Sequence, residues 1–229
     1  MPSAFAPSAF ALDACYPLCY GQLMEIVLAT KNRKKIEEIS RILKDVARFA
    51  FLALDDFPFC PEVVEDSGTF EGNAVKKALT VARCTGRPAI ADDSGLEVYA
   101  LNNAPGVLSA RYAAPDEGDI ANNEKLLAAM RHLPDEMRGG RFVCCIAFAL
   151  PNGTLMTFRG DSEGIIGKQP AGSSGFGYDP LFYPEGHCRT FAEMLPEEKD
   201  SLSHRKKALD LLKAYLETTF LSVGMRNCL

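Results

Sequence analysis

The stretch RFVCCIAFALPNGTLMTFRGDSEGII, residues 141–166, decides the fold class of this chain. Two runs of strand type flank the Pro-Asn-Gly segment at 151–153, and a turn of this composition between two such runs predicts a β-hairpin. Cys144 and Cys145 are neighbours in the first run. Because successive residues of a strand point to opposite faces, both are predicted to be small core residues on the two sides of a sheet.

The rest of the chain mixes strands with helices. Apolar runs typical of strands occur at 25–30, 49–54, 89–92 and 96–101. Apolar residues at helical spacing predict helices at 36–46, 69–86, 119–132 and 203–220. Gly86 is the predicted C-terminal stop of the second helix, and Ser203 is the predicted N-cap of the last. This mixture predicts a single α/β domain on a mixed sheet over residues 24–220, with a poorly ordered N-terminal extension at 1–23 and a C-terminal tail at 221–229.

The bulk composition is that of a globular protein. Of the 229 residues, 47% are hydrophobic and 24% are charged, and the net charge is −5 with a pI near 5.3. A protein that binds duplex nucleic acid usually carries a basic stripe, so this balance argues against one. No stretch approaches the roughly 20 apolar residues of a membrane span, and residues 1–23 fit neither a secretory signal nor a transit peptide. We expect a cytoplasmic protein with no nucleic-acid partner and no membrane partner.

Eight cysteines raise the question of a disulfide or a zinc site. No C-x-x-C pair occurs, and Cys15 and Cys19, four residues apart, are weak evidence for a metal. The spacing supports neither a disulfide nor zinc. A reduced cytosolic compartment is therefore the expectation.

The first candidate site is TKNRKK, residues 30–35, between a predicted strand and a predicted helix. Turn amides, a helix N-terminus and several cations meet there, which suits a phosphate. Thr30 and Asn32 offer neutral hydrogen bonds, and the positive charge comes from Lys31, Arg33, Lys34 and Lys35. It is not a P-loop, because G-x-x-x-x-G-K-[ST] does not occur. A solvated basic helix start is the alternative interpretation.

Two acidic stretches, EVVEDSGTF at 62–70 and ADDSG at 91–95, carry candidate metal ligands. Mg²⁺ prefers carboxylate oxygens, with substrate phosphates completing its coordination. Asp92 and Asp93 stand where the strand predicted at 89–92 ends. One of them can hold a metal or polarise water while its neighbour orients the turn. The alternative interpretation is an ordinary turn with both groups in water.

Two later stretches, PAGSSGFGYDPLF at 170–182 and EEKDSLSHRKK at 197–207, complete the candidates. Glycines and aromatics in the first suggest backbone close to a flat ligand, with Phe176 or Tyr178 able to stack on a base. The second places Lys199, His204 and Arg205 near a helix start. A common glycine-rich turn and an ordinary surface helix are the alternatives.

Together, the order and spacing of these stretches resemble the inosine triphosphate pyrophosphatase family, which acts on non-canonical purine nucleotides. The resemblance runs from about Met24 to about Leu212. It rests on T-x-N-x-x-K at 30–35, F-x-x-N-A-x-x-K-A at 70–78, ADDSGLEV at 91–98, APGVLSARYA at 104–113, GFGYDPLF at 175–182 and EEKDSLSHR at 197–205. In the second motif the family normally has Glu before Asn, whereas Gly72 stands here with Glu71 beside it. The resemblance implies an elongated single domain on a central mixed β-sheet flanked by helices.

The resemblance also implies roles for individual residues. Glu65 and Asp93 would hold Mg²⁺, and Asp93 would also activate water. The triphosphate would be bound by the 30–35 loop with Lys77 and Ser94, and Arg111 would lie near the phosphates or the sugar. The residues implied to line the base pocket are Phe176, Gly177, Tyr178, Asp179, Lys199, His204 and Arg205.

The implied activity is hydrolysis of ITP, dITP and XTP between the α and β phosphates by a homodimer, releasing the monophosphate and pyrophosphate. A pocket rich in donors suits the 6-oxo group of hypoxanthine and xanthine, whereas the 6-amino group of adenine faces it with a mismatch worth roughly 1–3 kcal/mol. Two other hypotheses stay open. One is a pyrophosphatase selective for pyrimidine or modified nucleotides, and the other is a nucleotide sensor without catalysis.

Overall fold

The computed structural model describes residues 23–115 and 117–221. The predicted extension at 1–23 and the predicted tail at 221–229 therefore lie outside the described residues, except for Leu23 and Leu221. Within the described ranges, no helix combines the length and the apolar character needed to cross a membrane.

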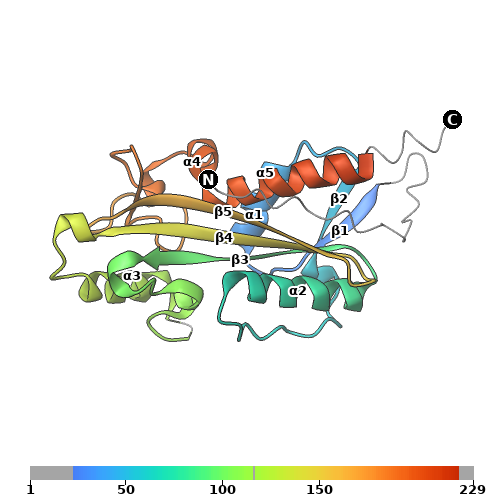
Figure 1. Cartoon of the computed structure of the whole chain (residues 1–229), viewed down its shortest axis with the longest axis horizontal. Coiled ribbons are helices and arrows are strands. Elements are labelled where there is room, and N and C mark those ends of the chain that lie inside the picture. Colours follow the sequence, from blue (N-terminus) through green and yellow to red (C-terminus); the bar gives the residue numbers. More distant parts are fainter. Residues whose placement is uncertain (1–22, 116, 222–229) are drawn as a thin grey trace, which may run out of the picture.

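A six-stranded mixed sheet, in the order β2-β1-β3-β4-β5-β6, forms the centre of the described part of the chain. Its strands are β1 (Met24–Leu28), β2 (Phe49–Ala53), β3 (Ala89–Val98), β4 (Gly139–Ala149), β5 (Leu155–Ile166) and β6 (Phe182–Pro184). β1 is parallel to β2 and β3, and the pairs from β3 to β6 are antiparallel. The long strands β3, β4 and β5 follow the longest axis of the molecule in Figure 1, so the expected elongated α/β fold is confirmed.

Helices cover both faces of the sheet (Figure 1). α1 (Arg33–Leu43) and α5 (His204–Leu216) pack on one face, and α2 (Phe70–Thr85) packs on the other. α3 (Gly118–Ala129) and α4 (Pro196–Leu202) contribute to a third core cluster. Both predicted caps are confirmed, since Gly86 ends α2 with φ +66° and the Ser203 side chain accepts from Lys206 N. α5 ends at Leu216, before a π-helical turn at Glu217–Leu221, and does not continue to 220 as predicted.

The predicted hairpin is confirmed as β4 and β5, whose register begins with Ala149 opposite Leu155. Cys144 and Cys145 are both buried and belong to different core clusters. The first packs with side chains of α1 and α5, and the second with side chains of α2. The two cysteines therefore lie on opposite faces of the sheet, as predicted.

The strands predicted at 89–92 and 96–101 are one continuous strand, β3, and residues 99–101 form a 3₁₀ turn. Asp92 and Asp93 thus lie inside a strand, and the prediction that they stand at a strand end is wrong. Asp, Ser and Gly usually favour turns. Here unbroken pairing with β4, from Ala89 opposite Ala149 to Val98 opposite Gly140, overrides that tendency.

A disulfide joins Cys60 to Cys84, whose Cα atoms are 5.8 Å apart. The expectation that the spacing supports no disulfide is wrong for this pair. The two residues are 24 positions apart in sequence, and they meet because the loop before α2 folds back along that helix.

Candidate active site

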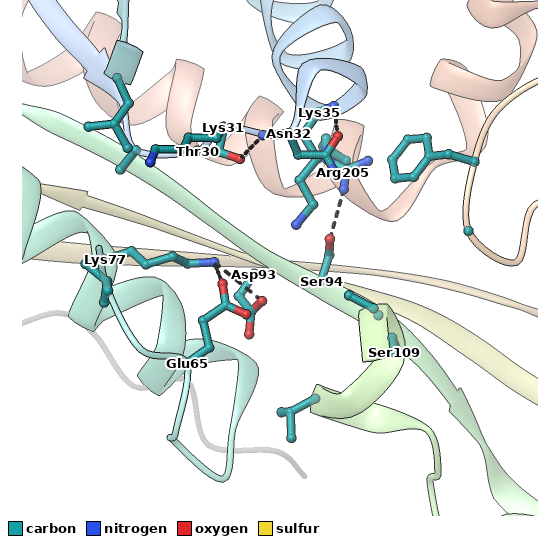
Figure 2. Close-up of a pocket in the computed structure, with 18 of the residues that line it drawn as sticks. Thr30, Lys31, Asn32, Lys35, Glu65, Lys77, Asp93, Ser94, Ser109 and Arg205 are labelled. Atoms are coloured by element: carbon teal, nitrogen blue, oxygen red, sulfur yellow. Dashed lines mark hydrogen bonds and ion pairs between the residues drawn. The ribbon is translucent and has the colours of Figure 1, made fainter. Parts of the chain in front are cut away.

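The candidate site lies where β3 extends beyond the end of β1. β1 pairs with β3 only at Ala89 and Ile90, so β4 is the only named strand that pairs with the following residues of β3 in the described part of the chain. A cavity of about 510 Å³ opens beside this free edge. Figure 2 shows that it takes side chains from both sides of the strand, with Glu65 and Lys77 on one side and Lys35 on the other.

Residues 30–35, called the 30–35 loop, run from the end of β1 into the first turn of α1 and contribute part of the predicted phosphate cradle. Asn32 caps α1, because its side-chain oxygen accepts a hydrogen bond from Lys35 N at 3.2 Å. The loop residues that line the cavity are Thr30, Lys31, Asn32 and Lys35. Arg33 and Lys34 are exposed and do not line it, and Lys34 Nζ donates instead to the carbonyl of Gly175 at 3.0 Å.

Asp92 and Asp93 point to opposite faces of β3, which separates two adjacent like charges. Asp92 is 1% exposed and pairs with Lys35 of α1 and, at 2.9 Å, with Arg205 of α5. Burial alone would raise the pKa of this carboxyl, but the two cations hold it well below its usual value. The alternative of a solvated turn is therefore wrong, and Asp92 is a buried anion that ties α1 and α5 to the sheet.

Asp93 faces α2 and meets Glu65, which lies in the loop before that helix. Lys77 Nζ lies 2.6 Å from Glu65 Oε1 and 3.5 Å from Asp93 Oδ1 (Figure 2). Asn73, one turn earlier on α2, donates from Nδ2 to Asp93 Oδ2 at 3.0 Å. The two predicted metal ligands therefore converge on one ammonium group.

The surroundings act differently on the pKa values of the Asp93 and Glu65 carboxyls. Burial raises the pKa of Asp93, and the neighbouring charge of Glu65 adds to this, although Lys77 and Lys35 act in the opposite direction. Burial also acts to raise the pKa of Glu65, but Lys77, together with Lys35 and Arg111, outweighs burial and lowers that pKa. The surroundings therefore shift the pKa values of the two carboxyls in opposite directions.

These two carboxylates fit a divalent cation such as Mg²⁺. Their oxygens are hard ligands, and the Lys77 ammonium between them demonstrates that positive charge is accommodated there. Among the described residues, no group of three or more His, Cys, Asp or Glu side chains could hold a metal. A cation held by two carboxylates needs oxygens of a phosphorylated ligand and of water to complete its coordination.

The resemblance assigned Ser94 to the phosphates and Arg111 to the phosphates or the sugar, and the structure separates the two residues. Ser94 lines the cavity, and its hydroxyl donates to Asp92 Oδ1 at 3.0 Å. Arg111 does not line the cavity, and its Nη2 donates to the backbone carbonyl of Glu65 at 3.0 Å. Arg111 therefore supports the Glu65 loop.

The residues assigned to the base pocket come together at the other end of the cavity, which is lined by Phe176, Gly177, Tyr178, Asp179, Lys199, His204 and Arg205. Lys199 Nζ donates to Glu38 at 2.8 Å and to Asp179 at 2.7 Å, and Arg205 also pairs with Glu38. The Phe176 ring centroid lies 5.0 Å from Lys199 Nζ and 5.7 Å from the Arg205 guanidinium carbon. This end is an aromatic platform beside cations that buried carboxylates hold in place.

His204 contributes a different group to the same end. Its ring stacks on Phe142, with centroids 4.8 Å apart and planes at 10°. Burial and the nearby Arg205 hold its pKa well below the usual value, so the imidazole is neutral. Its Nδ1 has no hydrogen-bond partner within the described part of the chain, which leaves this buried nitrogen able to bond a ligand.

No role was predicted from the sequence for Asn73, Glu38 or Asp119, although each belongs to the site or supports it. Asn73 stands inside the F-x-x-N-A motif, so its position was visible there. Glu38 gave no signal, because a charged residue in an amphipathic helix normally faces water, whereas here it is 7% exposed.

The departure at Gly72 also has a structural basis. A Cβ at this position would lie 2.0 Å from Ser67 Oγ and 2.9 Å from Ser67 Cβ, so a larger residue here would require the Ser67 side chain to shift. The adjacent Glu71 accepts a hydrogen bond from Thr157 of β5 at 2.8 Å and does not line the cavity. Glu71 therefore does not replace the family's carboxylate.

The fold and the site together define a class of α/β protein. Cations and two convergent carboxylates at one end of the cavity suit a phosphate chain, and the aromatic platform at the other suits a flat ring. The model of the Ham1 family matches residues 26–215, and the chain belongs to this family. This confirms the family resemblance stated from the motifs.

Relatives of named activity and a solved structure agree with this assignment. A dITP/XTP pyrophosphatase of Desulforamulus reducens is 50% identical over 81% of this chain and 92% of its own length. A dITP/XTP pyrophosphatase of Geobacter sulfurreducens is 49% identical over 85% of this chain and 97% of its own. The structure of a HAM1 protein from Coxiella burnetii, 41% identical, superposes with a TM-score of 0.80 and covers 86% of this chain and 100% of that one.

Proposed function

We propose that this protein is a nucleoside triphosphate pyrophosphatase that hydrolyses ITP, dITP and XTP to the monophosphate and pyrophosphate in the presence of Mg²⁺. The observation that carries the proposal is the convergence of Glu65 and Asp93 beside the 30–35 loop, in a cavity that ends at the Phe176 ring. The dITP/XTP pyrophosphatases that are about 50% identical to this chain support the same reaction.

In this proposal the phosphate chain lies between the 30–35 loop and Lys77. Thr30 and Asn32 donate hydrogen bonds to it, Ser94 does so once its hydroxyl turns away from Asp92, and Lys31, Lys35 and Lys77 balance its charge. Glu65 and Asp93 would hold Mg²⁺, which would supply positive charge against the charge that develops on the phosphate oxygens. Asp93 also orients water for attack and accepts its proton at a carboxylate oxygen, a task for which its raised pKa suits it.

The base lies on Phe176 near Lys199, His204 and Arg205. Positive charge around this ring favours the 6-oxo acceptor of hypoxanthine or xanthine over the 6-amino donor of adenine. Each buried mismatch of this kind costs roughly 1–3 kcal/mol, which corresponds to a preference of about 5- to 150-fold.

The test is a steady-state assay of pyrophosphate and orthophosphate release from ITP, dITP, XTP, ATP, GTP, CTP and UTP, with Mg²⁺ and with EDTA. We expect pyrophosphate from the first three, loss of activity with EDTA, and a fall of about 100-fold or more in kcat for Asp93→Asn. Asp66→Asn is the matched control, because Asp66 neighbours Glu65 but does not line the cavity. Faster turnover of ATP or of pyrimidine nucleotides, or unchanged hydrolysis by Asp93→Asn, contradicts the proposal.

The homodimer implied by the family resemblance and the cytoplasmic location expected from the sequence stay predictions. Size-exclusion chromatography with light scattering distinguishes a dimer of about 50 kDa, twice the 25.0 kDa chain, from a monomer.

A further inference from the structure

One turn of α3 presents three polar side chains to the loops that form the base end of the cavity. Asp119, Asn122 and Asn123 are related by helical spacings of three and four, so they share one face. Asp119 Oδ2 accepts a hydrogen bond from Gly177 N at 2.7 Å, and Asn123 Nδ2 donates to Gly177 O at 3.0 Å. The amide and the carbonyl of one loop residue are thus both held by the same helix.

The third side chain holds a second loop. Asn122 Oδ1 accepts from Ala113 N at 2.7 Å, and its Nδ2 donates to Ala110 O at 3.2 Å. The two loops are also joined directly, because Tyr178 donates from its hydroxyl to Ser109 O at 2.9 Å. α3 therefore connects the 175–179 loop and the 106–113 segment, and both of them line the cavity.

The 175–179 loop needs such anchors. It contains no regular secondary structure, and Gly175 and Gly177 have φ values of +77° and +61°. Glycines in this region of conformational space leave the backbone with little intrinsic preference for one state. Because Phe176 lies between them, the position of its ring depends on what holds the Gly177 peptide.

We propose that Asp119 and Asn123 are positioning residues that fix the Phe176 platform and so determine affinity for the nucleobase, without taking part in hydrolysis. The inference rests on the proposed function, because it takes the Phe176 end of the cavity to bind the base. The phosphate end lies on other parts of the chain, namely the 30–35 loop, β3 and α2, so loss of these anchors acts on one end of the substrate only. A pre-formed platform binds a flat ligand more tightly than one that must be ordered on binding.

The experiment compares Asp119→Ala, Asp119→Asn and Asn123→Ala with the wild type in ITP hydrolysis. For Asp119→Ala we expect KM to rise about tenfold, which is about 1.4 kcal/mol, with kcat within about twofold of wild type. Asp119→Asn keeps a side-chain oxygen that can accept from Gly177 N and is expected to restore KM to within about threefold. Asn123→Ala is expected to raise KM in the same direction. Glu124→Ala, an exposed position on the same helix, is the matched control.

Inhibition by pyrophosphate separates positioning from general loss of structure. Pyrophosphate occupies only the phosphate end, so its inhibition constant should stay within about twofold in Asp119→Ala while KM for ITP rises. An unchanged KM in Asp119→Ala overturns the inference, as does a parallel loss of kcat, pyrophosphate inhibition and thermal stability. A wild-type protein that does not hydrolyse ITP contradicts the proposed function itself, and the inference falls with it.

Discussion

Asn73 donates a hydrogen bond of 3.0 Å to Asp93, and the two side chains are 0% and 6% exposed. The other end of the same amide accepts from Ser67 N at 2.9 Å. One buried side chain therefore orients the proposed base and also fixes the loop that carries Glu65. Outer groups of this kind set the direction of the carboxylates that hold a metal.

Replacing Asn73 should weaken catalysis more than folding. We expect Asn73→Ala to lower kcat or the affinity for Mg²⁺ by about 10- to 100-fold, because Asp93 loses its orienting donor. Mg²⁺ titrations of activity, together with Mn²⁺ binding followed by electron paramagnetic resonance, measure both quantities. Lys76→Ala on the same helix, which pairs with the exposed Asp66, should behave as wild type. Equal metal affinity and equal kcat in Asn73→Ala would show that this amide orients nothing of importance.

Removing the cation of a buried pair should destabilise the protein. Arg205→Met removes one of the two cations that pair with Asp92 and one of the two that pair with Glu38, and Lys35 and Lys199 remain. We therefore expect the free energy of unfolding to fall by about 3–5 kcal/mol. Urea unfolding measures this. Lys206→Ala, which breaks an exposed pair with Asp210 on the same helix, should cost less than about 1 kcal/mol. Similar losses in the two variants would contradict the assignment of Asp92 as a structural anion.

His204 should make stability depend on pH in mildly acid solution. Its folded pKa lies well below the usual 6.5, so below that pH the unfolded chain binds a proton that the folded chain does not. The free energy of unfolding is therefore expected to decrease as the pH is lowered, by about 1.4 kcal/mol between pH 7.5 and 5.5. Urea unfolding at the two pH values measures the change, and His204→Phe should remove it. The other two histidines, His132 and His187, are exposed. If His204→Phe loses as much stability between the two pH values as the wild type, another group causes the effect.

Reducing the Cys60–Cys84 disulfide should destabilise the fold. A crosslink over 24 residues restricts the unfolded chain and is worth about 3–4 kcal/mol. We expect dithiothreitol and the Cys60→Ser variant to lower the free energy of unfolding by the same amount, while Cys188→Ser, at an exposed free cysteine, has little effect. Wild-type protein that is indifferent to the reductant would refute this contribution.

Motifs in the sequence predicted the fold class and family well, because strand runs, helical spacing and the Pro-Asn-Gly turn are local signals. Asp92 and Asp93 mark the limit of that approach. Their neighbours Ser94 and Gly95 favour a turn locally, and only pairing with β4, which is remote in sequence, makes the segment a strand. Tertiary pairing of this kind has no counterpart in a window of nearby residues.

The same limit explains which parts of the site the sequence could not reveal. Lys199 and Arg205 were predicted as free donors, but Glu38, more than 160 positions earlier in the chain, accepts from both. Cys60 and Cys84 meet only through the fold of a loop, and the anchors on α3 contact backbone atoms whose positions depend on distant strands. Contacts between side chain and backbone leave no pattern of residue types for a motif to capture.

Because side chains alternate between the two faces of β3, the site constrains the register of this strand as well as its residue types. Slipping this strand by one residue against β4 would turn Asp93 toward the α1 and α5 layer and Asp92 toward Lys77. The proposed base and the structural anion would then exchange places, even though every residue was still present. A one-residue deletion between Ala89 and Asp92 should therefore be far more damaging than most substitutions there, and evolution of this strand is expected to proceed by replacement and not by change of length.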